Sequence, residues 1–301
     1  MRQFHGTRPG LVGRLFVFGL GYSATVLARR LKVQGWIVGG TVQGEDRQAA
    51  LVAEGLNAVV FDGERPLSDF DTALARATHI LISVPPGAEG DRVLARHATD
   101  IAALKGIKWI GYLSTTGVYG DTDGAWVDER AGLHPTGPRG RARVAAERAW
   151  LDLGRLGLPV HVFRLAGIYG PGRSALDAVR AGTARRIVKP GQVFSRIHVE
   201  DIASVLAASM AQPNPGAVYN VCDDEAAPPQ DVIAYAAALL GMPAPPEIPF
   251  AEAAKSMSEM ARSFYDDNRR VANRRIKDEL GARLAYPDYR AGLKALLAAG
   301  A

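Results

Sequence analysis

The amino-acid sequence predicts an α/β fold with a doubly wound parallel sheet and a smaller, interleaved C-terminal part. Over the first 115 residues, short apolar runs alternate with segments of helical spacing. The runs are almost continuously apolar, as strands are when helices cover both faces of their sheet. A glycine-rich turn separates the first run from the first helical segment. Such alternation calls for parallel strands joined by helices.

Each element follows from its local pattern. The first strand ends at a glycine, and the helix after it carries Val26, Leu27 and Leu31 at helical spacing before Gly35 ends it. The predicted strands are 15–18, 36–41, 57–61, 80–84, 109–113, 160–165 and 217–221. The predicted helical segments are 25–34, 47–54, 67–77 and 91–104. A proline-rich stretch at 243–249 is expected to be a surface connection before the C-terminal helices.

Composition narrows the function classes. The chain has one cysteine, Cys222, so it forms no internal disulfide, which fits a reducing cytoplasm. No apolar run approaches the roughly 18 residues of a membrane span, and residues 1–10 lead into no apolar stretch of a secretory signal. The net charge is +5, but the arginines are scattered, which disfavours nucleic-acid binding. Binding of an anionic small-molecule ligand would explain the excess of positive charge equally well.

The turn after the first strand is the main candidate ligand site. Gly19, Gly21 and Ala24 form G-x-G-x-x-A between a predicted strand and a predicted helix. Glycines there let the backbone approach a pyrophosphate, and the helix offers free N–H groups with Tyr22 and Ser23 in its first turn. The alternative is a tight turn without a ligand. The surrounding strand–helix–strand pattern favours a nicotinamide dinucleotide.

The second strand ends without the carboxylate that normally binds an NAD ribose. Thr41 stands at that place, and Arg47 follows near enough to bind a 2′-phosphate. The sequence therefore favours NADP over NAD, although Arg47 is equally well explained as a solvated charge. Further cofactor contacts are predicted after the third strand, at Asp62, and after the fourth, at Ser83, Val84 and Pro85, with Pro86 on the substrate side. No metal site is predicted.

Several segments together resemble the extended short-chain dehydrogenase/reductases, the NAD-dependent epimerase/dehydratase family, and most closely its atypical members. They are Tyr112 to Gly120 (YLSTTGVYG), Arg164 to Arg173 (RLAGIYGPGR), Arg196 to Ala203 (RIHVEDIA) and Asn268 to Gly281, together with the glycine turn. The resemblance covers about residues 14–297. It implies a Rossmann-type sheet, a catalytic hydroxyl at Thr115 three residues before Val-Tyr-Gly, and often a homodimer formed through helices beside the sheet.

The sequence departs from the family at its Tyr-x-x-x-Lys motif. The matching segment, Gly137 to Arg143 (GPRGRAR), places Arg139 at the tyrosine and Arg143 at the lysine. In the family the tyrosine relays a proton and the lysine holds the nicotinamide ribose. A guanidinium stays protonated above pH 12, so Arg139 cannot relay a proton as a phenol does. Arg143 can replace a lysine electrostatically.

No other tyrosine has the helical spacing from Arg143 that a substitute for the family's tyrosine requires. Tyr112 is expected in the core, and Tyr119 and Tyr169 in structural positions. The family's fold implies that Thr116, Arg173, Arg196 and His198 lie on the substrate side. Arginines bind carboxylate or phosphate with a planar fork, so convergence of Arg139, Arg143, Arg173 and Arg196 near the site would favour an anionic substrate. The alternative is that these are four separate surface arginines and that His198 has a packed structural role.

We therefore expect a dinucleotide-binding part at 14–165 plus 197–221 and a substrate part at 166–196 plus 222–301. The first functional hypothesis is an NAD(P)-dependent oxidoreductase or epimerase acting on a small molecule. The second is a dinucleotide-binding sensor or regulatory protein without turnover, because fold alone does not settle activity. We expect the protein to bind a small-molecule substrate and to form a homodimer, and we expect it to bind neither nucleic acid nor a membrane.

Overall fold

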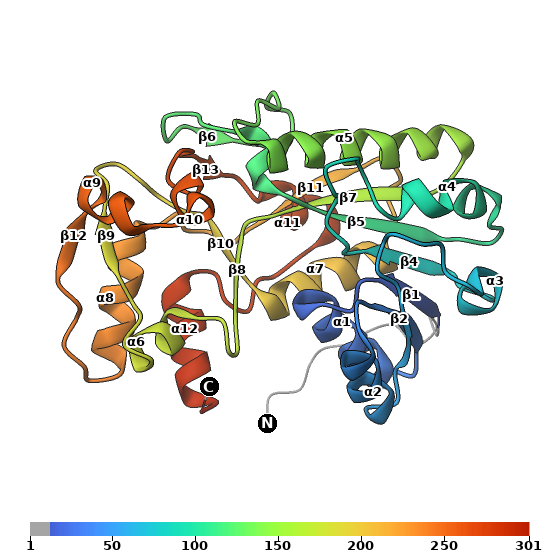
Figure 1. Ribbon diagram of the computed structural model, residues 1–301, viewed down its shortest axis with the longest axis horizontal. Coiled ribbons are helices and arrows are strands. Elements are labelled where there is room, and N and C mark those ends of the chain that lie inside the picture. Colours follow the sequence, from blue (N-terminus) through green and yellow to red (C-terminus); the bar gives the residue numbers. More distant parts are fainter. Residues whose placement is uncertain (1–12, 301) are drawn as a thin grey trace.

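The computed structural model describes residues 13–300 and is built around one parallel sheet (Figure 1). The residues 1–10, where we expect no secretory signal, lie outside the described part. The sheet has seven strands in the order β11-β7-β5-β4-β1-β2-β3. They are β1 (Arg14–Phe18), β2 (Ile37–Val42), β3 (Asn57–Val60), β4 (His79–Ile82), β5 (Trp109–Thr115), β7 (Val160–Leu165) and β11 (Val218–Val221). The predicted α/β fold class is confirmed.

The chain winds away from β1 in both directions. β1 pairs in parallel with β2 on one side and with β4 on the other, so the strand order reverses between β1 and β4. In such sheets a crevice opens beyond the carboxyl ends of the strands at the point of reversal. The glycine turn after β1 and the exit of β4 both lie at this edge.

Helices cover both faces of the sheet. One face packs against α1 (Tyr22–Val33), α2 (Glu45–Ala53), α7 (Val199–Ala211) and α11 (Arg274–Leu280). The other packs against α3 (Phe70–Ala73), α4 (Leu94–Ala103) and α5 (Pro138–Leu153). In Figure 1, α5 lies above the sheet and α1 and α7 lie below it. Alternate residues of each strand therefore enter two separate apolar cores.

The predicted helix over 67–77 is wrong for most of its length, since only four residues are helical. The backbone N–H of Leu67 donates to Nε2 of His97, and the Asp69 carboxylate caps the short helix at Thr72. Arg76 then adopts a left-handed conformation with φ of 60°. Contacts with α4 at one end and a left-handed residue at the other leave no room for further turns.

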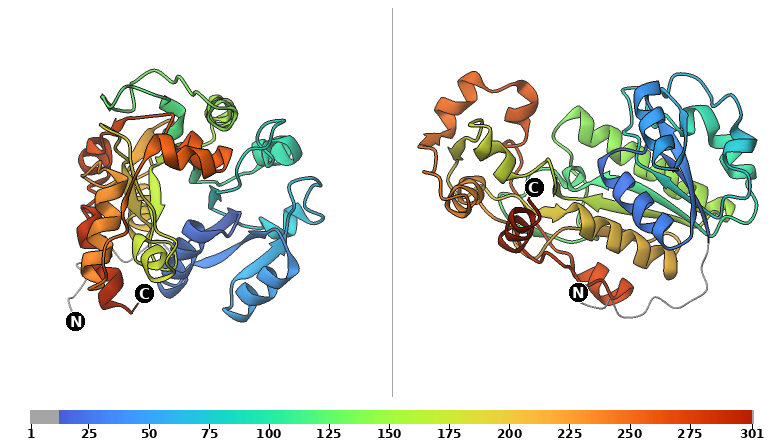
Figure 2. Two further views of the ribbon diagram at one scale, coloured as in Figure 1. Left: turned by 60° about the vertical axis from the view of Figure 1, so that its left-hand side comes forward. Right: turned by 90° about the horizontal axis from the view of Figure 1, so that it is seen from below.

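The remaining elements form small sheets and helices. Three two-stranded sheets pair β6 (Trp126–Val127) with β13 (Arg270–Val271), β8 (Gly167–Tyr169) with β10 (Arg196–His198), and β9 (Arg186–Val188) with β12 (Glu247–Pro249). The helices are α6 (Ala175–Arg180), α8 (Pro229–Leu239), α9 (Phe250–Ala253), α10 (Glu259–Ser263) and α12 (Tyr289–Ala298), and 3-10 turns lie at Thr116–Tyr119, Gly154–Leu156 and Ala254–Ser256. Most of these elements gather beyond one end of the large sheet (Figure 2).

A separate apolar cluster holds α6, α8 and α12 together around Leu176, Ala236 and Leu293. This cluster lies outside the two cores of the large sheet. None of the described helices is long and apolar enough to cross a membrane.

Candidate functional site

The turn after β1 is shaped by Gly19. Its φ of +94° is a conformation that side chains rarely adopt. A Cβ there would lie 3.1 Å from both the backbone N and Cγ2 of Val84, so β4 approaches closely only because residue 19 is glycine. The N–H of Gly19 donates to Oγ1 of Thr41 at 2.8 Å. The turn is therefore fixed between the exits of β2 and β4.

Gly21 caps α1 and faces open space. No atom lies within 4 Å of the position that its Cβ would take. The first bond into the helix runs from Thr25 N–H to Gly21 C=O, so the amides of Tyr22, Ser23 and Ala24 have no intrahelical acceptor. No acidic residue lies in this first turn. The turn thus leaves free donors and the positive end of a helix dipole beside an open surface, which suits an anion.

Three predicted cofactor residues lie at the exits of β2 and β3. Thr41 is buried, and its hydroxyl accepts the Gly19 N–H, so it shapes the turn. Nη2 of Arg47, an exposed residue, reaches back to Oγ1 of Thr25 on α1 at 3.3 Å. The Asp62 carboxylate accepts the N–H groups of Glu64 and Arg65, and these bonds lower its pKa. Arg47 therefore lies beside the glycine turn, while Asp62 closes its own loop.

The exit of β4 lines the same edge. Ser83 N–H donates to Phe18 C=O at 2.8 Å, which continues the β1–β4 pairing to the start of the turn. Val84 packs against Gly19, Ser83 and Pro86 are half-buried, and Pro85 is exposed. Two successive prolines supply no backbone donors, so the strand ends here.

The exit of β5 places Thr115 at the carboxyl edge. Thr115 is half-buried and its Oγ1 accepts the N–H of Gly117 at 3.1 Å, whereas Thr116 is buried. The hydroxyl keeps one proton to donate to a ligand. A Cβ on Gly140 of α5 would lie 3.2 Å from Gly117 C=O, so the first turn of α5 packs directly on the Thr115 turn.

Arg139 and Arg143, the two arginines of α5 predicted to lie at the site, have different surroundings. Arg139 lies in the first turn and is exposed, and it forms no side-chain hydrogen bond or ion pair with residues 13–300. Arg143, one turn later, donates through Nη1 to Leu113 C=O at 2.6 Å and to the Tyr112 hydroxyl at 3.2 Å. Burial raises the pKa of Tyr112 well above its usual range. Tyr112 is therefore a fixed neutral partner of Arg143.

Sequence reasoning missed Arg269. Its Nη1 donates to Gly120 C=O and to the Asp267 carboxylate, both at 2.8 Å. A Cβ on Gly117 would lie 3.9 Å from Nη2 of Arg269 and 3.4 Å from Oγ1 of Thr115. Arg269 thus brings a cation to the Thr115 turn from a segment about 150 residues away, which no local motif signals.

Sequence reasoning also missed a buried network beneath α5. Arg164 on β7 forms an ion pair with Glu147 at 2.8 Å, and its Nη1 donates to the Tyr119 hydroxyl at 2.9 Å. That hydroxyl donates in turn to Asn220 on β11 at 2.7 Å. Glu147 lies four residues after Arg143 on the same face of the helix, so the pair fixes α5 against the sheet. A carboxylate one turn after Arg143 was the available signal.

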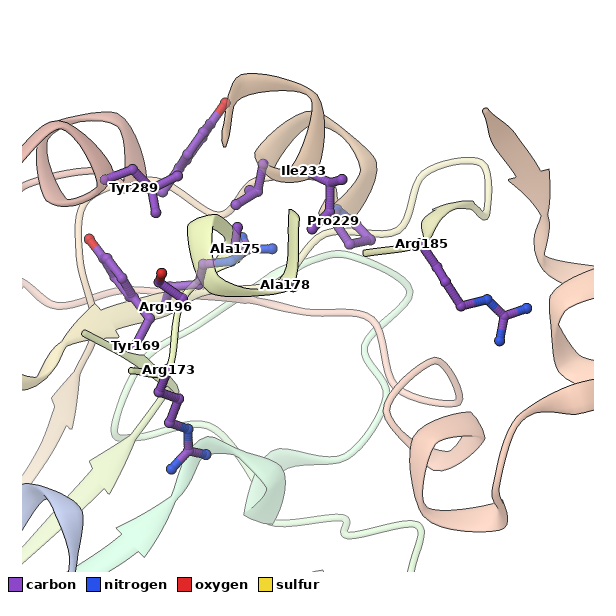
Figure 3. A pocket seen from close by; sticks show the side chains of 12 residues that line it. Tyr169, Arg173, Ala175, Ala178, Arg185, Arg196, Pro229, Ile233 and Tyr289 are labelled. Atoms are coloured by element: carbon purple, nitrogen blue, oxygen red, sulfur yellow. The ribbon is translucent and has the colours of Figure 1, made fainter. Parts of the chain in front are cut away.

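The substrate-side residues lie in two places. Arg173 lies over the Tyr22 ring, 5.7 Å from its centre, and the Tyr22 hydroxyl donates to Pro171 C=O at 3.0 Å. Arg196 lies farther inside, between Tyr169 and the helices α6, α8 and α12 (Figure 3). Arg196 donates to Phe194 C=O and Ala227 C=O, whereas Arg143 donates to Leu113 C=O and the Tyr112 hydroxyl, so these two arginines share no partner.

His198 is packed as a helix cap. It is 2% exposed, and its Nδ1 accepts the Glu200 N–H at the start of α7. Burial lowers the pKa of His198 to about 4, so its ring is neutral at pH 7. The rings of Tyr169 and Tyr286 pack against it, with centres 5.1 and 3.9 Å away. The packed role left open by the sequence fits these contacts.

Known proteins resemble the chain at several levels. A model of the NAD-dependent epimerase/dehydratase family matches residues 89–222. Protein YeeZ of Escherichia coli K12 is 29% identical over 91% of this chain and 97% of its own length. A solved structure described as a functionally unknown conserved protein from Silicibacter pomeroyi is 57% identical, with a TM-score of 0.88 over 95% of this chain and 99% of that one.

The fold extends to more distant structures. A UDP-glucuronic acid 4-epimerase from Bacillus cereus, solved in complex with NAD, has a TM-score of 0.76 at 16% identity, over 94% of this chain and 95% of that one. The distant structures share the fold of the chain. Together with the glycine turn, the sheet order and the Thr115 turn, the family-model match places residues 89–222 in the NAD-dependent epimerase/dehydratase family.

Proposed function

We propose that the protein binds a nicotinamide dinucleotide and is an oxidoreductase or epimerase acting on a small anionic substrate. The glycine turn carries this proposal. Gly19 brings the turn against β4, and Gly21 leaves open space before the unpaired amides of α1. The geometry suits a pyrophosphate, and the family's epimerase from Bacillus cereus is described in complex with NAD.

The residues around the turn fit the rest of the cofactor. Tyr22, Ser23 and Ala24 would supply amides to the pyrophosphate, and Ser83 to Pro85 would line the path towards Thr115. Among the described residues, Arg47 forms no ion pair, and its guanidinium lies beside α1. We therefore favour NADP over NAD, with Arg47 binding the 2′-phosphate, because no carboxylate at the end of β2 is placed to bind a ribose hydroxyl.

The bound nicotinamide would supply hydride chemistry, and this chain would position the substrate. Thr115 offers a hydroxyl proton to a carbonyl or hydroxyl oxygen. Arg143 has Nε and Nη2 free of partners among the described residues, so it could hold the nicotinamide ribose. Arg139, which forms no ion pair with residues 13–300, lies in the turn of α5 that packs on the Thr115 turn, and this favours a carboxylate or phosphate on the substrate. The charge of Arg269 is already paired with Asp267.

A second candidate is a dinucleotide sensor without turnover. The sequence match of Arg139 to the family's tyrosine position favours it, since a guanidinium does not exchange protons near pH 7. Burial also raises the pKa of Tyr119 to about 12 and that of Tyr112 further, so neither is tuned towards an acid–base role. A general acid or base works best with a pKa near the working pH.

The first experiment is a titration of the purified protein with NADPH and NADH, followed by fluorescence. We expect NADPH to bind more tightly and Arg47→Ala to weaken NADPH binding at least tenfold while changing NADH binding less than twofold. Arg65→Ala, which removes an exposed arginine in the loop after β3, is the control. Failure of both dinucleotides to bind would exclude the enzyme and the sensor alike. Turnover of carbonyl substrates that Thr115→Ala abolishes would favour the enzyme.

A further inference from the structure

A second cavity lies away from the glycine turn, between α6, α8 and α12 (Figure 3). Its volume is about 320 Å³, enough for a small organic molecule. Its walls are mainly apolar and include Ala178 of α6, Val232 of α8 and Leu293 of α12. Tyr169 and Tyr289 also line the cavity. No residue of the glycine turn or of the Thr115 turn lines this space.

Arg196 brings a positive charge to this apolar cavity. Its Nη1 donates to Phe194 C=O at 2.8 Å and to Ala227 C=O at 3.0 Å, which holds the guanidinium in place. Among residues 13–300, Arg196 forms no ion pair. Burial lowers its pKa, because the charged form is removed from water. Arg196 is half-buried, and a cation partly removed from water without a carboxylate partner is favourably placed to be neutralised by an anionic ligand.

The nearest acid does not neutralise it. Asp223 is 3% exposed, and one of its carboxylate oxygens has no hydrogen-bond partner among the described residues. Burial raises the pKa of Asp223 to about 8. Asp223 forms no ion pair with Arg196 and does not line the cavity, whereas Arg196 does.

The rim of the cavity is also basic. Arg173 and Arg185 line it, are exposed, and form no ion pair with any residue in the described part of the chain. Figure 3 shows the side chains of Arg173 and Arg185 directed away from the cavity, while Arg196 lies among the residues that line it. None of the described residues that line the space is acidic. Two rim cations raise the local concentration of anions and so favour their entry.

We propose that this cavity binds a small organic anion, with its carboxylate at Arg196 and its apolar body against Val232 and Leu293. A carboxylate matches the planar fork of a guanidinium, and the apolar walls select against inorganic anions. The site lies beyond the dinucleotide site but next to it, because Arg173 lines its rim and also covers the Tyr22 ring. Its ligand is therefore placed to act as a substrate or as an effector of cofactor binding.

The test uses ligand-observed fluorine NMR with 4-fluorobenzoate, 4-fluorophenyl phosphate and the neutral 4-fluorobenzyl alcohol. We expect the benzoate to bind at least tenfold more tightly than the alcohol. Arg196→Met keeps the apolar stem but removes the charge, and should weaken benzoate binding at least tenfold. Ala178→Leu fills the cavity without changing charge and should have a similar effect. Arg274→Gln, an exposed arginine of α11, is the control and should have none.

Several outcomes would overturn the proposal. They are equal binding of the acid and the alcohol, no binding of any probe at millimolar concentration, or unchanged benzoate affinity in both cavity variants. Tighter binding of 4-fluorophenyl phosphate than of 4-fluorobenzoate would show that the cavity prefers a phosphate to a carboxylate. Circular dichroism checks that each variant folds. Ala178→Leu should keep its NADPH affinity, which separates failure of this site from failure of the dinucleotide site. Benzoate binding that strengthens with NADPH would indicate a substrate, and binding that weakens NADPH would indicate an effector.

Discussion

Glu147→Gln tests whether the buried ion pair fixes the helix that carries Arg139 and Arg143. Glu147 is 2% exposed and Arg164 is 4% exposed, and three hydrogen bonds of 2.8–3.2 Å join their side chains. Glutamine keeps the size of the side chain but removes its charge. It also turns one acceptor into a donor that faces the guanidinium, so at least one of the three bonds is lost.

The expected loss of stability is large because Arg164 stays buried. Removing one partner of a buried ion pair costs about 3–5 kcal/mol of unfolding free energy, since the remaining charge is left uncompensated. The surviving bond from Arg164 to the Tyr119 hydroxyl moderates this cost, so we expect about 3 kcal/mol. Replacing both residues, as Glu147→Leu with Arg164→Met, removes the stranded charge and should restore much of the loss.

The assay is denaturant unfolding followed by circular dichroism. Asp278→Asn is the matched control, because Asp278 forms an ion pair with Arg274 at 2.9 Å with both side chains mostly exposed. Such a surface pair contributes less than about 1 kcal/mol. If Glu147→Gln cost no more than Asp278→Asn, or if the double variant were less stable than Glu147→Gln, the pair would not fix α5 as argued.

The remaining predictions concern the glycine turn and pH. Gly19→Ala should cost about 1–3 kcal/mol of unfolding free energy, because the residue has φ of +94° and its Cβ would press on Val84. Gly21→Ala should leave the fold intact and weaken dinucleotide binding at least tenfold. Equal thermal stabilities of the two variants, or unchanged dinucleotide binding by Gly21→Ala, would contradict this account. Burial lowers the pKa values of His79 and His198 to about 4 from 6.5, so the stability that these neutral rings contribute is present above pH 6.5 and is lost as the pH falls towards 4. His198→Asn, which keeps a cap for α7, should reduce this acid-induced loss in urea unfolding measured from pH 7 to pH 4, and an unaltered pH dependence would show that His198 titrates normally.

The sequence was enough for the large sheet because its signals are local. Apolar runs bounded by glycine and proline marked all seven strands, and the glycine turn marked the start of α1 within three residues. The confirmed family followed from ordered motifs. The helix expected at 67–77 failed because its ends depend on His97, thirty residues away, and on the left-handed conformation of Arg76.

The candidate site shows the same division. The resemblance to the family assigned Thr115 to the exit of the fifth strand and Arg139 and Arg143 to the Tyr-x-x-x-Lys positions. In the structure Thr115 ends β5, and both arginines lie near the start of α5, a helix that is not among the predicted segments. Spacing could not show that Arg143 is bonded to Leu113 C=O, or that Arg269 reaches the same turn. These contacts join segments that are distant in the chain, and such contacts depend on how whole layers pack.

By itself, the sequence determined the order of the seven strands of the large sheet and the glycine turn, because both depend on neighbouring residues. The assignment of Arg139 to the family's tyrosine position rests on the resemblance and stays a prediction. Only the tertiary structure decided which charges meet. It paired Arg164 with Glu147 in the core and left Arg196 beside a cavity without an ion-pair partner in the described chain. The cost of a buried charge depends on the dielectric surroundings and on partners, and both are set by packing that local sequence does not record.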